Sequence, residues 1–183
     1  MGINLVTSNP GKVKEFKIIL GDEIRVNHIS MEYKELRSDD SEEIAKDAAK
    51  MLAEESGKAI VVEDSGLFIE VLNDFPGTCS SYIHKRIGLK GILKLMENIE
   101  DRVCYYRSAV GYCEPNKEPV SFLGEEKGSI SKKIKGNYGF GHDPIFIAEG
   151  SNKTYGEMEN CENIKKFRRI AVEKLKEYLK KEE

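Results

Sequence analysis

Two short polar segments each follow an apolar run and combine the side chains that phosphate chemistry needs. The first is TSNPGK, residues 7–12, and the second is EDSG, residues 63–66. In the first, small hydroxyl and amide groups precede a glycine and a lysine that opens a helix. This favours a phosphate cradle, because backbone N–H groups at a helix N-terminus point at a bound anion. A capped helix with an exposed lysine explains the same residues, and the glycine spacing is not that of a P-loop.

The EDSG segment places Glu63 and Asp64 side by side at the predicted end of a strand. Neighbouring strand residues point to opposite faces, so only one of these acids enters a given site. Beside phosphate-binding groups a carboxylate repels the substrate unless a divalent cation lies between them, and Mg²⁺ prefers such hard oxygen ligands. A strand-ending turn with solvated acids is the alternative. Four further acids lie earlier in the chain, before the helix predicted from Ser41, and offer a second ligand: Glu32, Glu35, Asp39 and Asp40.

A third segment, GNYGFGHDPIF at residues 136–146, combines three glycines with an aromatic ring. Such a loop approaches a flat ligand closely, and Phe140 is positioned to stack on a base, a contact worth ~1–3 kcal/mol. The alternative is a structural turn with Phe140 in the core. His142 alone is more often a surface residue than an acid–base catalyst.

A fourth candidate is a basic cluster near the start of the final helix. Its ammonium and guanidinium groups suit phosphate or the keto oxygens of a base, whereas a solvated helix face is the default interpretation. The cluster contains Lys165, Lys166, Arg168 and Arg169.

Hydrophobic periodicity predicts an α/β fold around these segments. Strands are predicted at residues 3–7, 24–29, 59–62 and 143–147. Helices are predicted from Lys12, from Ser41 as N-cap to about Gly57, over 88–99 and over 163–181. The runs 102–114 and 118–130 predict an antiparallel hairpin. We therefore expect a mixed central sheet flanked by helices with an inserted hairpin lobe, in one elongated two-lobed domain of residues 1–183.

Composition limits the classes of function. The formal charge is −3, from 29 Lys+Arg and 32 Asp+Glu, which argues against binding polymeric nucleic acid but not against a single nucleotide. No signal sequence is recognisable and no apolar run approaches ~20 residues, so we expect a cytoplasmic protein without membrane partners. The four cysteines form no CxxC pair, which predicts reduced thiols.

The order and spacing of these motifs resemble one family over nearly the whole chain, from Val6 to about Leu175. The family is the inosine/xanthosine triphosphate pyrophosphatases, which hydrolyse noncanonical purine nucleotides. The matching motifs are Thr7-x-Asn9-x-x-Lys12-x-x-Glu15, Glu63-Asp64-Ser65-Gly66-Leu67, Phe75-Pro76-Gly77 with Ser80, Phe122-x-Gly124 with Gly128-x-Ile130, and Gly139-Phe140-Gly141-His142-Asp143-Pro144-Ile145-Phe146.

The resemblance implies Mg²⁺-dependent hydrolysis of a purine nucleoside triphosphate (ITP, dITP or XTP) to monophosphate and pyrophosphate, by a homodimer. Asp64 would be the general base and share Mg²⁺ with Glu35, and Lys12 would stabilise the departing pyrophosphate. A homodimer contact is expected around residues 75–82. The substrate-binding residues implied are Thr7, Ser8, Asn9, Pro10, Gly11, Lys12, Ser65, Phe140, Gly141, His142, Asp143 and Arg168.

The chain departs from the family before its last helix, where relatives have Lys-Asn and then Ser-His-Arg. Here Glu162-Asn163 and Lys166-Phe167-Arg168 stand at those positions, with Lys165 or Lys166 as a possible substitute for the missing lysine. His142 also replaces a more usual Tyr or Trp. Two alternatives therefore stay open: a pyrophosphatase with a shifted base preference, and a non-catalytic nucleotide-binding module.

Overall fold

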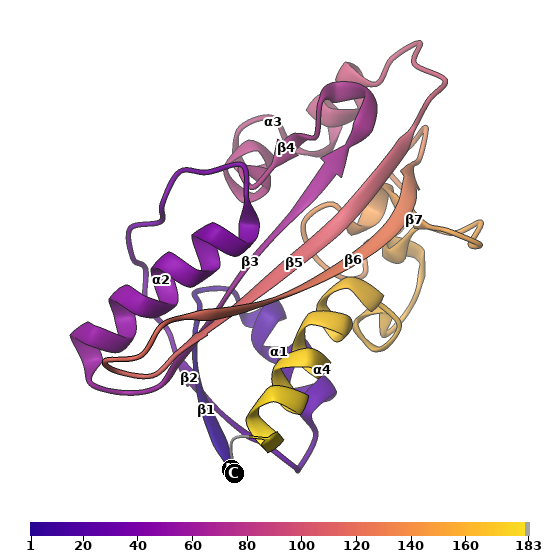
Figure 1. Cartoon of the computed structure of the whole chain (residues 1–183). Helices are drawn as coiled ribbons and strands as arrows, with labels where there is room; N and C mark the ends of the chain where they lie inside the picture. The colour runs from indigo at the N-terminus through magenta and orange to yellow at the C-terminus, as the bar shows by residue number, and fades with distance from the viewer. Residues whose placement is uncertain (182–183) are drawn as a thin grey trace. The chain divides into compact units, whose positions relative to one another are not determined.

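Strands and helices alternate along the computed structural model, which describes residues 1–181. The longer elements are β1 (Gly2–Val6), α1 (Pro10–Leu20), β2 (Arg25–Ile29), α2 (Ser41–Ser56), β3 (Ile60–Ile69), β4 (Phe75–Gly77), α3 (Ser80–Leu95), β5 (Val103–Cys113), β6 (Val120–Ile130), β7 (Phe146–Ala148) and α4 (Lys166–Lys181) (Figure 1). Short 3₁₀ helices lie at Glu70–Leu72, Asp143–Ile145, Tyr155–Glu157 and Cys161–Asn163. Within residues 1–181 no helix is long and apolar enough to cross a membrane.

The strands form a mixed sheet in the order β2-β1-β3-β5-β6-β7, with β4 paired to β3. Strand β1 runs parallel to β2 and β3, whereas β4 and β7 run antiparallel to their partners. The N–H of Ile130, at the end of β6, donates to the carbonyl of Arg102, just before β5, at 2.9 Å. That bond joins the end of one strand to the start of its neighbour, as an antiparallel hairpin requires. The predicted mixed sheet and hairpin are confirmed.

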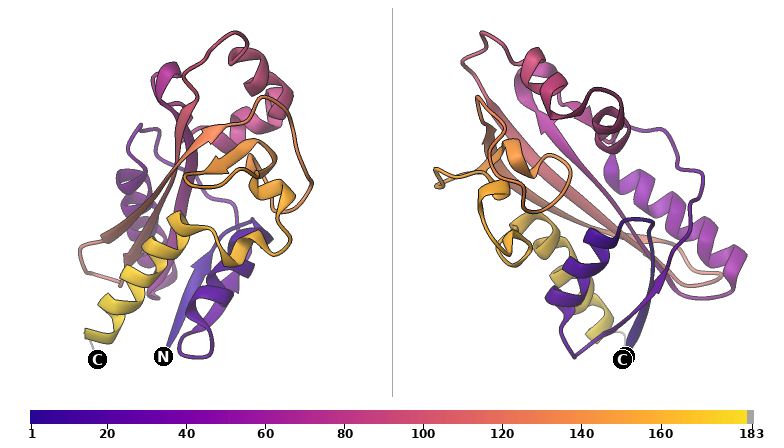
Figure 2. Two further views of the ribbon diagram at one scale, coloured as in Figure 1. Left: turned by 90° about the vertical axis from the view of Figure 1, so that its right-hand side faces the viewer. Right: turned by 180° about the vertical axis from the view of Figure 1, so that it is seen from behind.

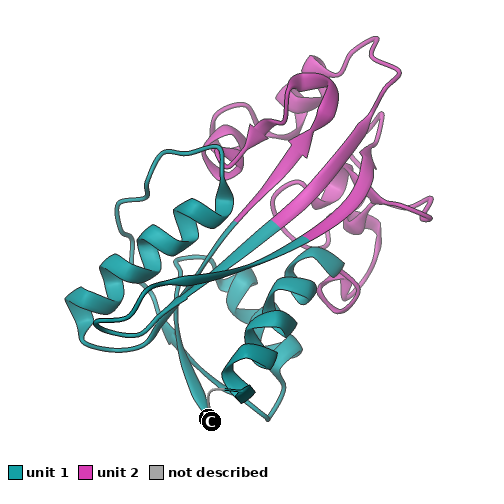
Figure 3. Ribbon diagram, in the orientation of Figure 1, with its two compact units in different colours: residues 1–64, 108–124, 166–183 teal, residues 65–107, 125–165 magenta. Residues whose placement is uncertain are grey.

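The chain divides into two compact units (Figure 3). Unit 1 comprises residues 1–64, 108–124 and 166–183, and unit 2 comprises residues 65–107 and 125–165. Strands β3, β5 and β6 each contribute residues to both units.

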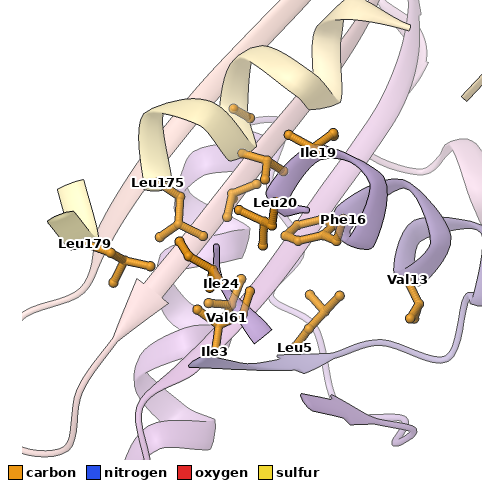
Figure 4. Close-up of a cluster of buried hydrophobic side chains, with 13 residues drawn as sticks. Ile3, Leu5, Val13, Phe16, Ile19, Leu20, Ile24, Val61, Leu175 and Leu179 are labelled. Atoms are coloured by element: carbon orange, nitrogen blue, oxygen red, sulfur yellow. The ribbon is translucent and has the colours of Figure 1, made fainter. Parts of the chain in front are cut away.

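In unit 1, helices cover both faces of the sheet, with α2 on one face and α1 and α4 on the other (Figure 2). The alternation of side chains along β3 explains this arrangement. Val61 packs in the cluster formed with α1 and α4 (Figure 4), whereas Val62 packs with the alanine-rich face of α2. Each fully buried Val or Leu in these clusters stabilises the fold by about 1.5–3 kcal/mol.

In unit 2, β4 pairs with the second half of β3 and leads into α3. A Cβ at Gly66 would lie 2.2 Å from the carbonyl oxygen of Gly77, so only glycine permits this approach. The hydroxyl of Ser80 accepts the N–H of Leu67 at 2.8 Å and donates to the Gly77 carbonyl at 2.6 Å. These contacts tie the start of α3 to the strand pair.

The predicted end of one strand is wrong. The strand expected at residues 59–62 continues to Ile69, because β4 pairs with Leu67, Phe68 and Ile69. Glu63 and Asp64 therefore lie inside β3, not in a turn that follows it.

Several helix boundaries also differ from the prediction. Asp40, not Ser41, caps α2, because its carboxylate accepts the N–H groups of Glu42 and Glu43 at 2.8 and 3.4 Å. The helix expected at 88–99 is the second part of α3, which begins at Ser80 and is interrupted at Gly88 by a φ of 61°. Helix α4 begins at Lys166, and residues 143–145 form a 3₁₀ turn before β7.

Candidate active site

The turn after β1 is held by its own side chains. The Thr7 hydroxyl accepts the N–H of Asn9 at 3.1 Å, and the Asn9 side chain accepts the N–H of Gly11 at 2.8 Å, which caps α1. Pro10 occupies the first turn of the helix, where a missing N–H costs nothing. Ser8 and Pro10 are exposed. The turn therefore presents the N-terminus of α1 to solvent in a fixed conformation.

Lys12 projects from α1 to Glu63 in unit 1. Its ammonium lies 2.8 Å from Glu63 Oε2 and donates to the Glu63 backbone carbonyl at 2.8 Å. The Lys12 side chain keeps 18% of its surface exposed, whereas that of Glu63 is fully buried. The lysine is thus anchored at its tip yet remains accessible.

Glu63 also belongs to a buried cluster of charges. Its Oε1 accepts the Arg168 Nε at 2.9 Å and the Ser108 hydroxyl at 2.5 Å, and Arg168 Nη1 pairs with Glu15. Burial alone would raise the pKa of Glu63, but Arg168 and Lys12 outweigh it and lower the pKa to about 2. Two acids and two bases therefore balance one another inside unit 1.

Arg168, predicted to bind substrate, is 1% exposed and makes its ion pairs with carboxylates of this cluster. Glu15 and Glu63 were not among the predicted site residues. A signal existed in the helical spacing: Arg168 lies on the same face of α4 as Val172, Leu175 and Leu179, all buried. A charged residue within an apolar stripe indicates a buried ion pair.

Asp64 points to the opposite face of β3 from Glu63, as alternation requires. Among the described residues, its Oδ2 is buried and has no hydrogen-bond partner. Burial raises the pKa of Asp64 to about 6, opposed by Lys12 and by the Ser41 hydroxyl and assisted by Glu63 and Glu35. An unsatisfied carboxylate oxygen beside an ammonium group is what a bound cation or water would complete.

Glu35 lies in the segment between β2 and α2 and is exposed. It is close enough to Asp64 for its charge to raise the pKa of that carboxyl. Tyr33 faces the same acids, because after burial the charges of Glu35, Asp64 and Glu63 raise the pKa of its hydroxyl. Unit 1 therefore brings the two predicted metal ligands into one electrostatic neighbourhood.

The glycine-rich loop of unit 2 is built around Asp143. Its Oδ2 accepts the Phe140 N–H at 2.7 Å and the Lys165 ammonium at 2.7 Å, and its Oδ1 accepts the Tyr106 hydroxyl at 3.2 Å. A Cβ at Gly139, where φ is +71°, would lie 2.1 Å from that carboxylate, so the turn requires glycine. Asp143 thus fixes the Phe140 backbone and a buried lysine together.

Lys165 is 2% exposed, and its ammonium lies 4.4 Å from the centre of the Phe140 ring. This geometry is a cation–π contact in a partly desolvated setting. Phe167, which stands near the family's histidine position, is buried in unit 1 instead. Of the two lysines predicted as substitutes for the one missing at Glu162, Lys165 is the one that contacts the loop of unit 2.

The other predicted residues of the loop and of β3 differ in exposure. Gly141 has a φ of +63°, consistent with a glycine requirement. His142 is buried and packs edge-on against His84. Ser65 is half-buried in β3, directly after Asp64.

Sequence comparisons match this chain to known proteins along most of its length. The profile of the Ham1 family matches residues 3–178. A dITP/XTP pyrophosphatase of Methanopyrus kandleri is 46% identical over 182 residues, covering 98% of this chain and 97% of the relative. A dITP/XTP pyrophosphatase of Pyrococcus horikoshii is 45% identical over 159 residues, covering 86% of this chain and 85% of the relative.

Structural comparison agrees. The Ham1 protein of Staphylococcus aureus superposes with a TM-score of 0.85 at 26% identity over 100% of both chains. A HAM1 protein from Coxiella burnetii gives a TM-score of 0.83 over 99% of both chains, also at 26% identity. The resemblance predicted from the motifs is confirmed, and the chain belongs to the Ham1 family.

Proposed function

We propose that this protein hydrolyses noncanonical purine nucleoside triphosphates (ITP, dITP and XTP) to the monophosphate and pyrophosphate. The observation that carries the proposal is the buried, unpaired Oδ2 of Asp64, which lies close enough to Lys12 for the charge of that lysine to lower the pKa of the carboxyl. The names of the curated relatives, dITP/XTP pyrophosphatases, support both the reaction and the class of substrate.

Mg²⁺ is the cofactor we propose, held by Asp64 and Glu35. The donor set fits, because both groups are hard oxygen ligands and one carboxylate oxygen of Asp64 is unsatisfied. No group of three or more His, Cys, Asp or Glu residues within residues 1–181 is arranged to hold a metal. Mg²⁺ commonly takes one or two carboxylates and completes its shell with water and substrate phosphates. When bound, it supplies positive charge that neutralises the phosphate oxygens.

Asp64, Lys12 and the turn at residues 7–12, all in unit 1, have separate roles in the proposed reaction. Asp64 orients the attacking water and takes its proton. Lys12, anchored by Glu63, places its ammonium where negative charge develops on the departing pyrophosphate. The capped turn of residues 7–12 presents helix N–H groups to the triphosphate.

Base recognition is proposed for the loop of unit 2. Phe140 offers a ring for stacking, and Lys165 supplies an ammonium group in place of the lysine that relatives carry at the position of Glu162. Hypoxanthine and xanthine carry a keto oxygen where adenine carries an amino group. Donors placed for the keto oxygen are left unpaired against adenine, which disfavours that base.

Pyrophosphate release from ITP, XTP, GTP and TTP tests the proposal, with Asp64→Asn compared to the exposed control Asp39→Asn. We expect preference for ITP and XTP, and a loss of turnover of about 10²–10⁴-fold in Asp64→Asn alone. Equal rates on all four nucleotides would contradict the base preference and favour a pyrophosphatase of broader choice. Full turnover in Asp64→Asn would contradict the mechanism. Nucleotide binding without any turnover by the wild type would identify a non-catalytic module.

We also propose one functional domain over residues 1–183, acting as a homodimer in the cytoplasm. The sequence predicts reduced thiols, which are typical of a reducing compartment. The homodimer follows from the family resemblance, with residues 75–82 as the expected contact. Sedimentation equilibrium on the wild type and on Tyr82→Glu tests it, since Tyr82 is 58% exposed.

A further inference from the structure

Two of the chain's three histidines face one another within unit 2. His84 lies in α3 and His142 lies in the loop before β7, with ring centres 5.0 Å apart and ring planes at 77°. His142 is 5% exposed. Among the described residues, His84 Nδ1 and His142 Nε2 are both buried and both lack a hydrogen-bond partner. Each of these two adjacent rings thus has one buried nitrogen without a partner, which calls for a ligand that binds nitrogen.

The distance between the rings fits a shared metal ion. A metal bound at about 2.0–2.1 Å from an imidazole nitrogen lies about 3.2 Å from the ring centre, so two imidazoles at neighbouring corners of a tetrahedron have centres about 5 Å apart. The observed separation of 5.0 Å meets this requirement.

We propose that His84 Nδ1 and His142 Nε2 together bind a divalent transition metal ion, with water completing its coordination. Imidazole nitrogen suits Ni²⁺, Cu²⁺ and Zn²⁺, whereas carboxylate oxygen suits Mg²⁺, so the site is chemically distinct from the one proposed at Asp64. No third His, Cys, Asp or Glu joins the pair within residues 1–181. A bound ion would tie α3 to the loop that carries Phe140.

Calorimetric titration of the full-length, tag-free protein with NiCl₂ tests the site, after treatment with a chelator and without nucleotide. We expect one Ni²⁺ per chain, with affinity reduced at least tenfold in His84→Gln and in His142→Gln. His28→Gln is the matched control, because His28 Nε2 already lies 2.9 Å from the Thr7 carbonyl in unit 1. Its affinity should equal that of the wild type, and excess Mg²⁺ should not compete.

A second readout is the electron paramagnetic resonance spectrum of bound Cu²⁺, which should report two nitrogen ligands in the wild type and one in either variant. Absence of Ni²⁺ binding, or equal affinity in wild type, His84→Gln and His142→Gln, would overturn the proposal. If His142→Gln does not fold, the half-exposed His84 decides the question alone, since replacing it removes one ligand without opening a cavity around the other.

Discussion

Glu63 holds the ammonium of Lys12 twice, with its side chain at 2.8 Å and with its backbone carbonyl at 2.8 Å. The same residue accepts Arg168 from α4. The position of Lys12 is therefore set by the strand residue that immediately precedes Asp64. Strand β3 thus positions both groups proposed for the reaction, Lys12 and Asp64.

Replacing Glu63 by Gln should weaken both the fold and the reaction. Arg168 would lose one of its buried carboxylates, so we expect the free energy of unfolding to fall by about 3–5 kcal/mol. Turnover should also fall, because Lys12 loses its anchor. Urea denaturation and pyrophosphate release measure the two effects. Glu125→Gln is the control, since it breaks only the partly exposed pair with Arg107, which should cost under about 1 kcal/mol. Equal losses in both variants would contradict the buried role of Glu63.

Replacing Asp64 by Asn should stabilise the protein while it lowers turnover by about 10²–10⁴-fold. The pKa of Asp64 is raised, so at pH 7 the folded state holds its charged form at a cost that a neutral amide does not have. We expect a higher midpoint of urea unfolding without Mg²⁺, and a smaller rise in midpoint on adding Mg²⁺ than in the wild type. A lower midpoint in Asp64→Asn would show that its carboxylate is already satisfied.

Lys165 and Asp143 should behave as a coupled pair. Lys165→Met leaves a carboxylate that is 2% exposed without its counter-charge, which should cost about 3–5 kcal/mol. Asp143→Asn in the same chain removes that charge while an amide oxygen still accepts the Phe140 N–H. The double variant should therefore lose less than the sum of the single variants, by about 0.5–3 kcal/mol in a double-mutant cycle. Strict additivity would mean that the two charges do not interact.

His142 should make stability depend on pH below neutrality. Its pKa is lowered from 6.5 to about 4, so between these values the unfolded chain binds a proton that the folded chain does not. The contribution is complete above pH 6.5 and is lost as the pH falls towards 4, by up to about 3 kcal/mol. Urea denaturation from pH 7 to 4 should show a steeper loss for the wild type and His28→Gln than for His142→Gln. Parallel curves for all three would exclude this role.

The sequence predicted the core of the candidate site because local patterns determine it. Strands β1 and β3 are parallel neighbours, with Leu5 opposite Val61, so the turn at residues 7–12 and Asp64 both belong to unit 1. A short apolar run, Ile60-Val61-Val62, identified the start of β3, but the continuation of the strand past Asp64 depends on β4, whose three residues carry too short a pattern to recognise.

Long-range partners explain what the sequence could not predict. Arg168 pairs with Glu15, 153 positions earlier in the chain, and no spacing rule connects two such helices. The sequence leaves both Lys165 and Lys166 open as the substitute for the lysine that relatives carry at the position of Glu162. Only the position of Asp143 in the folded loop distinguishes Lys165 from Lys166.

Successive side chains of β3 point to opposite faces of the sheet, so its odd-numbered and even-numbered residues have different surroundings. Glu63 neutralises buried cations on one face, and Asp64 has an unsatisfied oxygen on the other. Deleting a single codon upstream within this strand would exchange the two environments. The anchoring carboxylate would then face α2, and the reactive one would sit between guanidinium and ammonium. The alternation of side chains along β3 therefore keeps the structural acid and the proposed reactive acid in separate environments.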